Sequence, residues 1–129
     1  MWMRVIECQG TPYEIGKQIG EGCRDILQHS METTFGILSR GYQITLEEVI
    51  ATAGKFMDPV RQYDPMLIEQ LQGQADAMGV PLENMFALRC IFEMSYYYKQ
   101  IQGLCTSFAV TGKATQEGKT LLGQNIDWL

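Results

Sequence analysis

The chain has 129 residues, 46% of them hydrophobic and 19% charged, and its formal net charge is −5. This composition is typical of a soluble globular protein and too apolar for a disordered one, while the acidic balance argues against a nucleic-acid-binding surface. Residues 1–10 lack the apolar stretch of a secretory signal, and no apolar run approaches the roughly 20 residues that span a bilayer, so we expect a cytoplasmic protein with no membrane partner.

Residues 3–8 are expected to form a short strand that ends at Gly10. A helix should follow, because Thr11 can serve as the N-cap, Pro12 suits the first helical position and Glu14 completes a capping box. We expect this helix to continue to about Leu38.

Two glycines of that helix, Gly16 and Gly20, are four positions apart and therefore share one face. A neighbouring backbone could approach closely there. A phosphate-binding loop is the weaker interpretation, because no G-x-G-x-x-G motif follows a strand.

Three further helices are expected. One begins at the Thr45 capping box and ends near Met57, before Pro59. The next is capped by Asp64 and stops at Gly79, and the last covers residues 81–96. Within the last helix, Arg89 and Glu93 are four residues apart and could pair.

After Gly103 the apolar period changes from 3.6 to 2, which predicts strands over residues 105–111 and 120–126. The glycine-bounded segment 112–118 would form the turn of a β-hairpin. The expected fold class is therefore α+β. A lone hairpin is marginal in water, so this one should pair with further strands or with another chain.

The cysteines include no C-x-x-C pair, and the only histidine is His29. We therefore expect no metal site and no cofactor, and His29, in the middle of a helix, is a weak candidate for a catalytic base. Three cysteines are expected to be small buried residues. They are Cys8, Cys23 and Cys90.

The fourth cysteine, Cys105, opens the hairpin. If the turn is centred between Thr115 and Gln116, Cys105 and Asp127 end almost opposite each other on adjacent strands, although a slip of one residue would change which side chains face one another. A carboxylate alone disfavours a thiolate. Cleavage before Cys105 would supply a better base, because an α-amino group has a pKa of about 7.7–8.0.

The segments 103–110 and 118–128, together with the opening motif 8–16, resemble the acyl-coenzyme A:6-aminopenicillanic acid acyltransferase family of N-terminal-nucleophile (Ntn) hydrolases, which are self-processing cysteine peptidases. The Gly-x-Asn-x-Asp-Trp motif is also similar to that of choloylglycine hydrolases and penicillin V acylases.

The resemblance implies an αββα sandwich made as an inactive precursor. The matching motif positions imply that Cys105 is the nucleophile, that Leu104–Cys105 is the processing bond and that Asp127 binds the freed amino group. Asn125 and Trp128 match positioning residues of the motif. The implied substrates are small molecules, either acyl thioesters such as acyl-coenzyme A or non-peptide C–N amides, and no cofactor is implied.

The sequence departs from the family pattern in two residues and in length. Leu104 stands where the family has Gly, and Gln124 where choloylglycine hydrolases have Arg. The chain ends at Leu129, whereas relatives continue. We therefore expect residues 1–129 to form one partial Ntn domain, with a mostly helical pro-segment over 1–104 and the start of the nucleophile-bearing β segment over 105–129, and little activity from this chain alone.

A non-enzymatic alternative remains open. The chain could be a truncated or split, catalytically inactive family member that acts as a folding or assembly module. Its hairpin edges would then recruit a second copy, since unpaired strand edges bind other strands.

Overall fold

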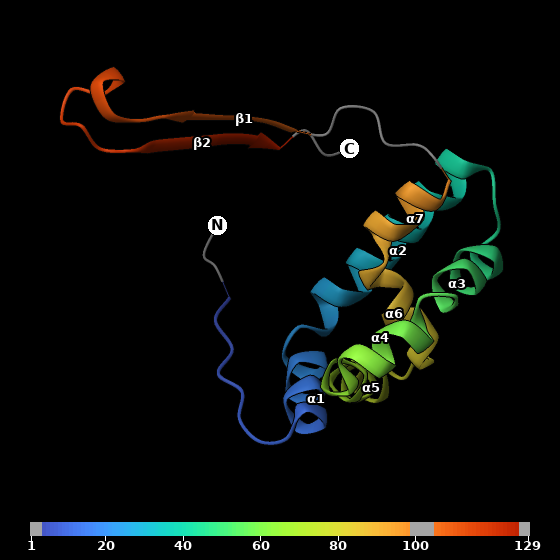
Figure 1. Cartoon of the computed structure of the whole chain (residues 1–129). Coiled ribbons are helices and arrows are strands. Elements are labelled where there is room, and N and C mark those ends of the chain that lie inside the picture. Colours follow the sequence, from blue (N-terminus) through green and yellow to red (C-terminus); the bar gives the residue numbers. More distant parts are fainter. Residues whose placement is uncertain (1–3, 99–104, 127–129) are drawn as a thin grey trace. The chain divides into compact units, whose positions relative to one another are not determined.

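The structure, a computed structural model, describes residues 4–98 and 105–126. The chain divides into two units, Met1–Tyr98 and Lys99–Leu129, and each is described by itself. The described part of the first unit is helical and that of the second is a β-hairpin (Figure 1), which agrees with the expected α+β class. The elements are α1 (Pro12–Gly22), α2 (Arg24–Tyr42), α3 (Leu46–Gly54), α4 (Met57–Tyr63), α5 (Pro65–Met78), α6 (Leu82–Arg89), α7 (Ile91–Tyr97), β1 (Cys105–Val110) and β2 (Leu121–Ile126).

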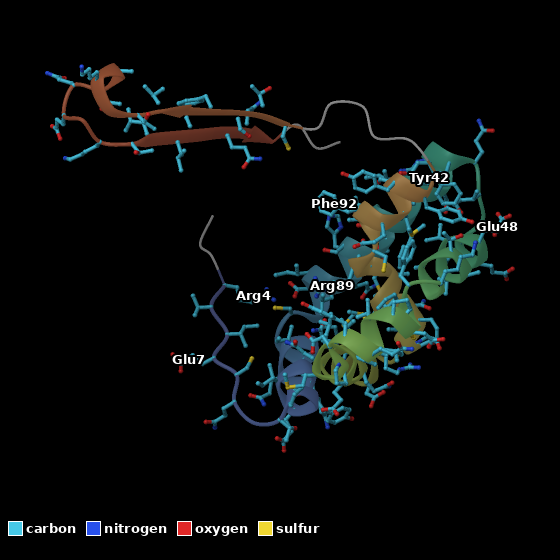
Figure 2. All side chains as sticks on the ribbon, in the orientation of Figure 1. Arg4, Glu7, Tyr42, Glu48, Arg89 and Phe92 are labelled. Carbon is cyan, nitrogen blue, oxygen red and sulfur yellow. The ribbon has the colours of Figure 1, made fainter. Side chains whose placement is uncertain are left out.

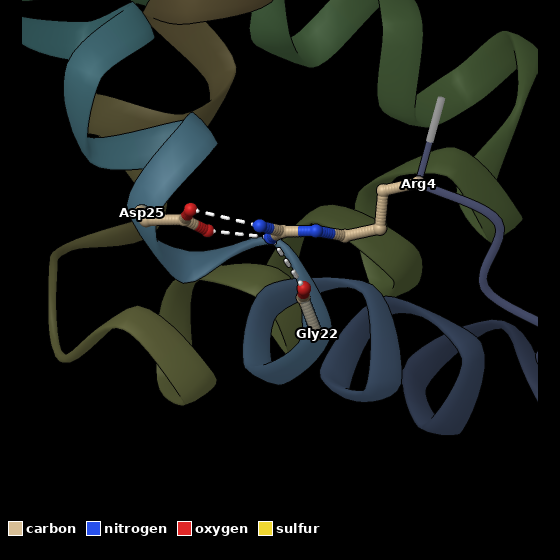
Figure 3. A network of polar contacts seen from close by, with 3 residues as sticks. All are labelled: Arg4, Gly22 and Asp25. Atoms are coloured by element: carbon tan, nitrogen blue, oxygen red, sulfur yellow. Dashed lines mark hydrogen bonds and ion pairs between the residues drawn. The ribbon is translucent and has the colours of Figure 1, made fainter. Parts of the chain in front are cut away.

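The strand predicted over residues 3–8 is wrong in its described part, because residues 4–8 form an irregular segment. The guanidinium of Arg4 donates hydrogen bonds to both carboxylate oxygens of Asp25, at 2.6 and 2.9 Å, and to the carbonyl oxygen of Gly22 at 3.0 Å (Figure 3). The Arg4 hydrogen bond is the main cause that lowers the pKa of Asp25 to about 2. These contacts tie the segment to the junction of α1 and α2 rather than to a strand.

The single helix predicted from Pro12 to Leu38 is two helices, α1 and α2, separated at Cys23. The capping box at Thr11 forms as expected. Cys23, however, has a non-helical backbone with φ −118° and ψ 20°, and the glycines just before it lower the helix propensity. The break lets α1 and α2 bury different faces against different neighbours.

The last predicted helix, over residues 81–96, is likewise divided, with α6 and α7 separated at Cys90. Arg89 therefore does not lie one turn from Glu93 on a continuous helix. Its guanidinium instead donates to the side-chain oxygen of Gln74 at 3.2 Å. Because Gln74 is only 3% exposed, this bond satisfies a polar group that would otherwise be costly to bury.

The helix predicted from Thr45 to near Met57 ends earlier, at Gly54, and a separate short helix, α4, follows. Pro59 lies in the first turn of α4, where a proline needs no intrahelical hydrogen-bond donor. The prediction for α5 is confirmed. Asp64 caps its start, and Gly79 ends it in a left-handed conformation with φ 71°.

Helices α1 and α5 lie side by side (Figure 1), and glycines line their contact. A Cβ atom added to Gly16 would lie 2.7 Å from the carbonyl carbon of Gln70, and one added to Gly20 would lie 2.6 Å from the Cβ of Ala77. On α5, a Cβ at Gly73 would lie 2.8 Å from the backbone nitrogen of Lys17. The predicted close approach at Gly16 and Gly20 is confirmed.

The core of the helical unit is formed by apolar side chains from α2 to α7. The largest fully buried side chains among them are Val49, Leu71, Met85 and Met94. In the part of the chain that the structure describes, no helix is both long and apolar enough to cross a membrane.

The predicted hairpin is confirmed. Strands β1 and β2 are antiparallel, with Cys105 opposite Ile126 and Val110 opposite Leu121. This register is symmetric about the point between Thr115 and Gln116, as the sequence predicts.

We expect Gly16→Ala to lower the free energy of unfolding by about 2 kcal/mol or more, because the added methyl group would collide with backbone that cannot rotate away. Gly41→Ala is the matched control. A Cβ at Gly41 in α2 meets nothing within 4 Å, so this change should raise the stability by up to about 1 kcal/mol. Urea denaturation followed by circular dichroism measures both. Equal effects of the two variants would contradict the close approach.

Candidate functional site

The candidate nucleophile, Cys105, is the first residue of β1 and is exposed. It lies at the open end of the hairpin, opposite Ile126, the last residue of β2. The strand register therefore fixes its position along the hairpin, and its thiol is accessible to a reactant. Both properties are required of a nucleophile that acts on a substrate from solution.

Of the other predicted site residues, the structure describes Asn125 alone. Asn125 lies opposite Thr106, and because side chains alternate along a strand, it projects from the sheet face opposite to that of Cys105. The structure thus brings Cys105 and Asn125 to the same end of the hairpin but to different faces. Leu104, Asp127 and Trp128 lie outside the described residues. Asp127 directly follows the residue opposite Cys105, and its approach to the thiol stays a prediction.

Each face of the hairpin carries both polar and apolar side chains. Next to Cys105 on its own face is the opposed pair Ser107 and Gln124, two neutral polar side chains. The other face carries Phe108, whose ring lies over Gly123. An aromatic ring that covers a cross-strand glycine shields the backbone and helps to hold the register.

The remaining cysteines lie in the helical unit and differ from Cys105 in environment. Cys90 is buried, as expected, and burial, followed by the nearby charge of Glu93, raises the pKa of its thiol to about 12. Cys8 and Cys23 are only half-buried, so the expectation of burial is confirmed for one of the three. Cys8 lies in the irregular segment and Cys23 at a helix junction, where packing is less complete.

The sequence did not predict a groove of about 660 Å³ in the helical unit. Its apolar lining includes Met31 and Phe35 of α2 and Met78 at the end of α5. At its rim, Arg24 donates hydrogen bonds to the carbonyl oxygens of Ala77 and Met78, the latter at 3.4 Å. The only sequence signal was the spacing of Arg24, Gln28, Met31 and Phe35, which places them on one face of a helix.

Among residues 4–98 and 105–126, no three His, Cys, Asp or Glu side chains come together in a way that could hold a metal ion. The sequence matches no protein-family model. The candidate site therefore rests on the residues and geometry described above.

The environments of Cys105 and Cys90 predict different reactivity towards an alkylating reagent. At pH 8 a brief treatment of the folded protein with iodoacetamide should modify Cys105 and leave Cys90 unmodified, because the Cys90 thiol is buried and almost fully protonated at that pH. Peptide mapping by mass spectrometry measures the extent at each site. After unfolding in urea, both should react. Equal labelling of the two cysteines in the folded protein would contradict the described environments.

Proposed function

We propose that this chain carries the nucleophile of a self-processing N-terminal-cysteine acyltransferase or amidohydrolase, which acts on acyl thioesters or on non-peptide C–N amide bonds. The observation that supports it best is the exposed Cys105 at the open end of a hairpin whose register places the residue before Asp127 opposite it. The motif resemblance over residues 103–110 and 118–128 supplies the reaction class.

Processing would begin with attack of the Cys105 sulfur on the carbonyl carbon of Leu104. A C–S bond forms, the C–N peptide bond breaks, and the nitrogen of Cys105 takes up a proton to become an amine. Water then hydrolyses the thioester. The products are a carboxylate at Leu104 and a free thiol beside a free α-amino group at Cys105.

The freed amine would act as the general base for its own thiol, because its ordinary pKa lies near neutral pH. We assign Asp127 to hold and orient this amine, and Asn125 and Trp128 to position the motif. With the amine as base, the negative charge of Asp127 need not activate the sulfur directly, which it would do poorly.

In the acyl-transfer cycle, the Cys105 sulfur would attack the acyl carbonyl of the substrate and expel a thiol, such as coenzyme A, or an amine. Water or an acceptor amine would then release the acyl group and regenerate the thiol. Acyl-coenzyme A is thus a candidate substrate and not a cofactor. Leu104, in place of glycine, restricts the backbone next to the scissile bond, so we expect slow processing.

Intact-mass spectrometry of the purified protein tests the proposal. We expect a fraction of the chain that grows with time to lack residues 1–104 and to begin at Cys105. Cys105→Ala removes the nucleophile and should stay uncut under the same conditions. Cys90→Ala, which removes a buried thiol remote in sequence, should cleave as the unmodified protein does. A wild-type chain that stays intact after prolonged incubation would contradict the proposal.

A second candidate function is assembly through the hairpin. It is favoured by three large apolar side chains that are more than half exposed on a two-stranded sheet, namely Phe108, Leu121 and Leu122. A two-stranded hairpin is marginal in water without a covering layer, and a second copy could supply one.

Sedimentation velocity at micromolar concentration distinguishes this candidate. If the hairpin assembles, Leu122→Glu should shift the protein towards monomer, because Leu122 is 78% exposed and a charge there would have to be buried in the complex. Cys105→Ala should leave the assembly unchanged. A clean monomer for the wild-type chain would exclude self-assembly.

A further inference from the structure

Helix α7 ends at Tyr97, eight positions before Cys105, within a run of three tyrosines, Tyr96, Tyr97 and Tyr98. Tyr98 is therefore the last described residue of the helical unit before the bond that the proposed function cleaves. The contacts at the end of α7 therefore determine how firmly the chain is held at Tyr98.

Tyr98 is fixed by its ring and by its hydroxyl. Its ring stacks on that of Tyr42, at the end of α2, with 4.8 Å between centroids and an interplanar angle of 26°; Figure 2 labels Tyr42. Its hydroxyl shares a hydrogen bond of 2.9 Å with the hydroxyl of Thr52 on α3. Thr52 is only 6% exposed, so this bond satisfies a buried polar group.

The neighbours of Tyr98 are held as well. The Tyr42 hydroxyl donates to Ser95 Oγ at 3.0 Å, and Ser95 in turn donates to the carbonyl oxygen of Ile91 at 2.8 Å. The ammonium group of Lys55 donates to the hydroxyl of Tyr97 at 2.6 Å and lies 4.4 Å from the centre of its ring, within cation–π range. We call the set Tyr42, Thr52, Lys55, Tyr97 and Tyr98 the aromatic clamp.

Apolar side chains could fill the same space as the tyrosine and threonine side chains, and they would have no hydroxyl groups that need hydrogen-bond partners. A network in which each buried hydroxyl has a partner specifies one geometry more narrowly than apolar packing does. The aromatic clamp therefore fixes the position and direction of the end of α7, using side chains from α2 and α3 that are more than 40 residues away in sequence.

We propose that the aromatic clamp is a positioning device for self-processing: by anchoring Tyr98 it restricts the conformations from which the Cys105 sulfur can reach the Leu104 carbonyl carbon. The inference rests on the proposed function. Its physical basis is that an intramolecular attack is fast only from a narrow range of geometries, and that fixing one end of the short segment that leads to the reacting groups reduces the number of conformations open to it.

The test compares cleavage rates, measured by intact-mass spectrometry, in the full chain. Tyr98→Ala and Tyr42→Ala each remove the ring stack, and each should slow cleavage about tenfold or more. Tyr42→Ala is the more informative variant, because residue 42 cannot act through the local backbone before Cys105. Tyr42→Phe keeps the stack and loses only the hydroxyl, so it should retain a larger share of the rate.

Two controls separate positioning from a general loss of stability. Tyr96→Ala removes a ring from the same helix, but Tyr96 is 69% exposed and lies outside the clamp, so the rate should not change. Ile68→Ala creates a cavity in the core at α5 and should lower the thermal midpoint at least as much as Tyr42→Ala does, yet leave the cleavage rate at 25 °C unchanged.

The possible outcomes are distinct. If the wild-type chain is not cleaved, the proposed function fails and the inference fails with it. If the wild-type chain is cleaved and Tyr42→Ala and Tyr98→Ala match its rate, the proposed function stands and the positioning role is overturned. The inference is also overturned if Ile68→Ala slows cleavage as much as the clamp variants do.

Discussion

The helical unit depends on the contact between α1 and α5, where two backbones meet with almost no side-chain volume between them. Gly16 faces the backbone of Gln70, and Gly73 faces the backbone of Tyr13 and Lys17. Because glycines on both helices make the approach possible, neither helix can shift along the other without a backbone collision. At the edge of this contact, the Tyr13 hydroxyl donates to Asp76 at 2.7 Å, and this bond raises the pKa of the tyrosine and lowers that of the carboxyl.

This constraint explains other features of the unit. Since α1 is held against α5, the chain has to change direction before α2 can cover the core, and it does so at Cys23. Arg4 and Arg24 each stabilise a helix C-terminus, Arg4 that of α1 through the Gly22 carbonyl oxygen and Arg24 that of α5 through those of Ala77 and Met78. Cationic groups at helix C-termini are favourable both as hydrogen-bond donors and as partners of the helix dipole.

Local signals in the sequence predicted local structure well. The capping boxes at Thr11 and Thr45, the stop at Gly79 and the turn between β1 and β2 all depend on residues within a few positions of one another, and each was predicted. The hairpin register follows from the turn, so the position of Cys105 at the open end could also be derived.

Features that depend on distant residues could not be predicted. The breaks at Cys23 and Cys90 follow from how the flanking helices pack, and nothing in the local sequence forbids a continuous helix there. Whether residues 3–8 pair as a strand depends on a partner strand, which the sequence of the segment itself does not reveal. The partner of Arg89 proved to be Gln74, which lies 15 residues earlier on α5. Of the candidate site, Cys105 and Asn125 were placed, whereas Asp127, Leu104 and Trp128 are outside the described residues.

Two cysteines of this chain lie in contrasting environments. Sulfur in the helical unit at Cys90 is withdrawn from solvent and kept protonated, whereas sulfur at Cys105 is exposed at a strand end. Cleavage before the exposed Cys105 would make it an N-terminal residue that carries both a thiol and an α-amino group. A free thiol and a free α-amino group come together on Cys105 only when the peptide bond before it is cut.

The most direct measurement detects a thiol and an α-amino group on the same cysteine. A cyanobenzothiazole reagent condenses stably only with a thiol and an amine on the same terminal cysteine. We expect one condensation product, located by fragment-ion mass spectrometry at Cys105, and none in Cys105→Ala. The claim that the backbone amine of Cys105 is set free to serve its own thiol would be contradicted if folded wild-type protein yields no such product while a parallel sample shows, by alkylation, that the Cys105 thiol is accessible.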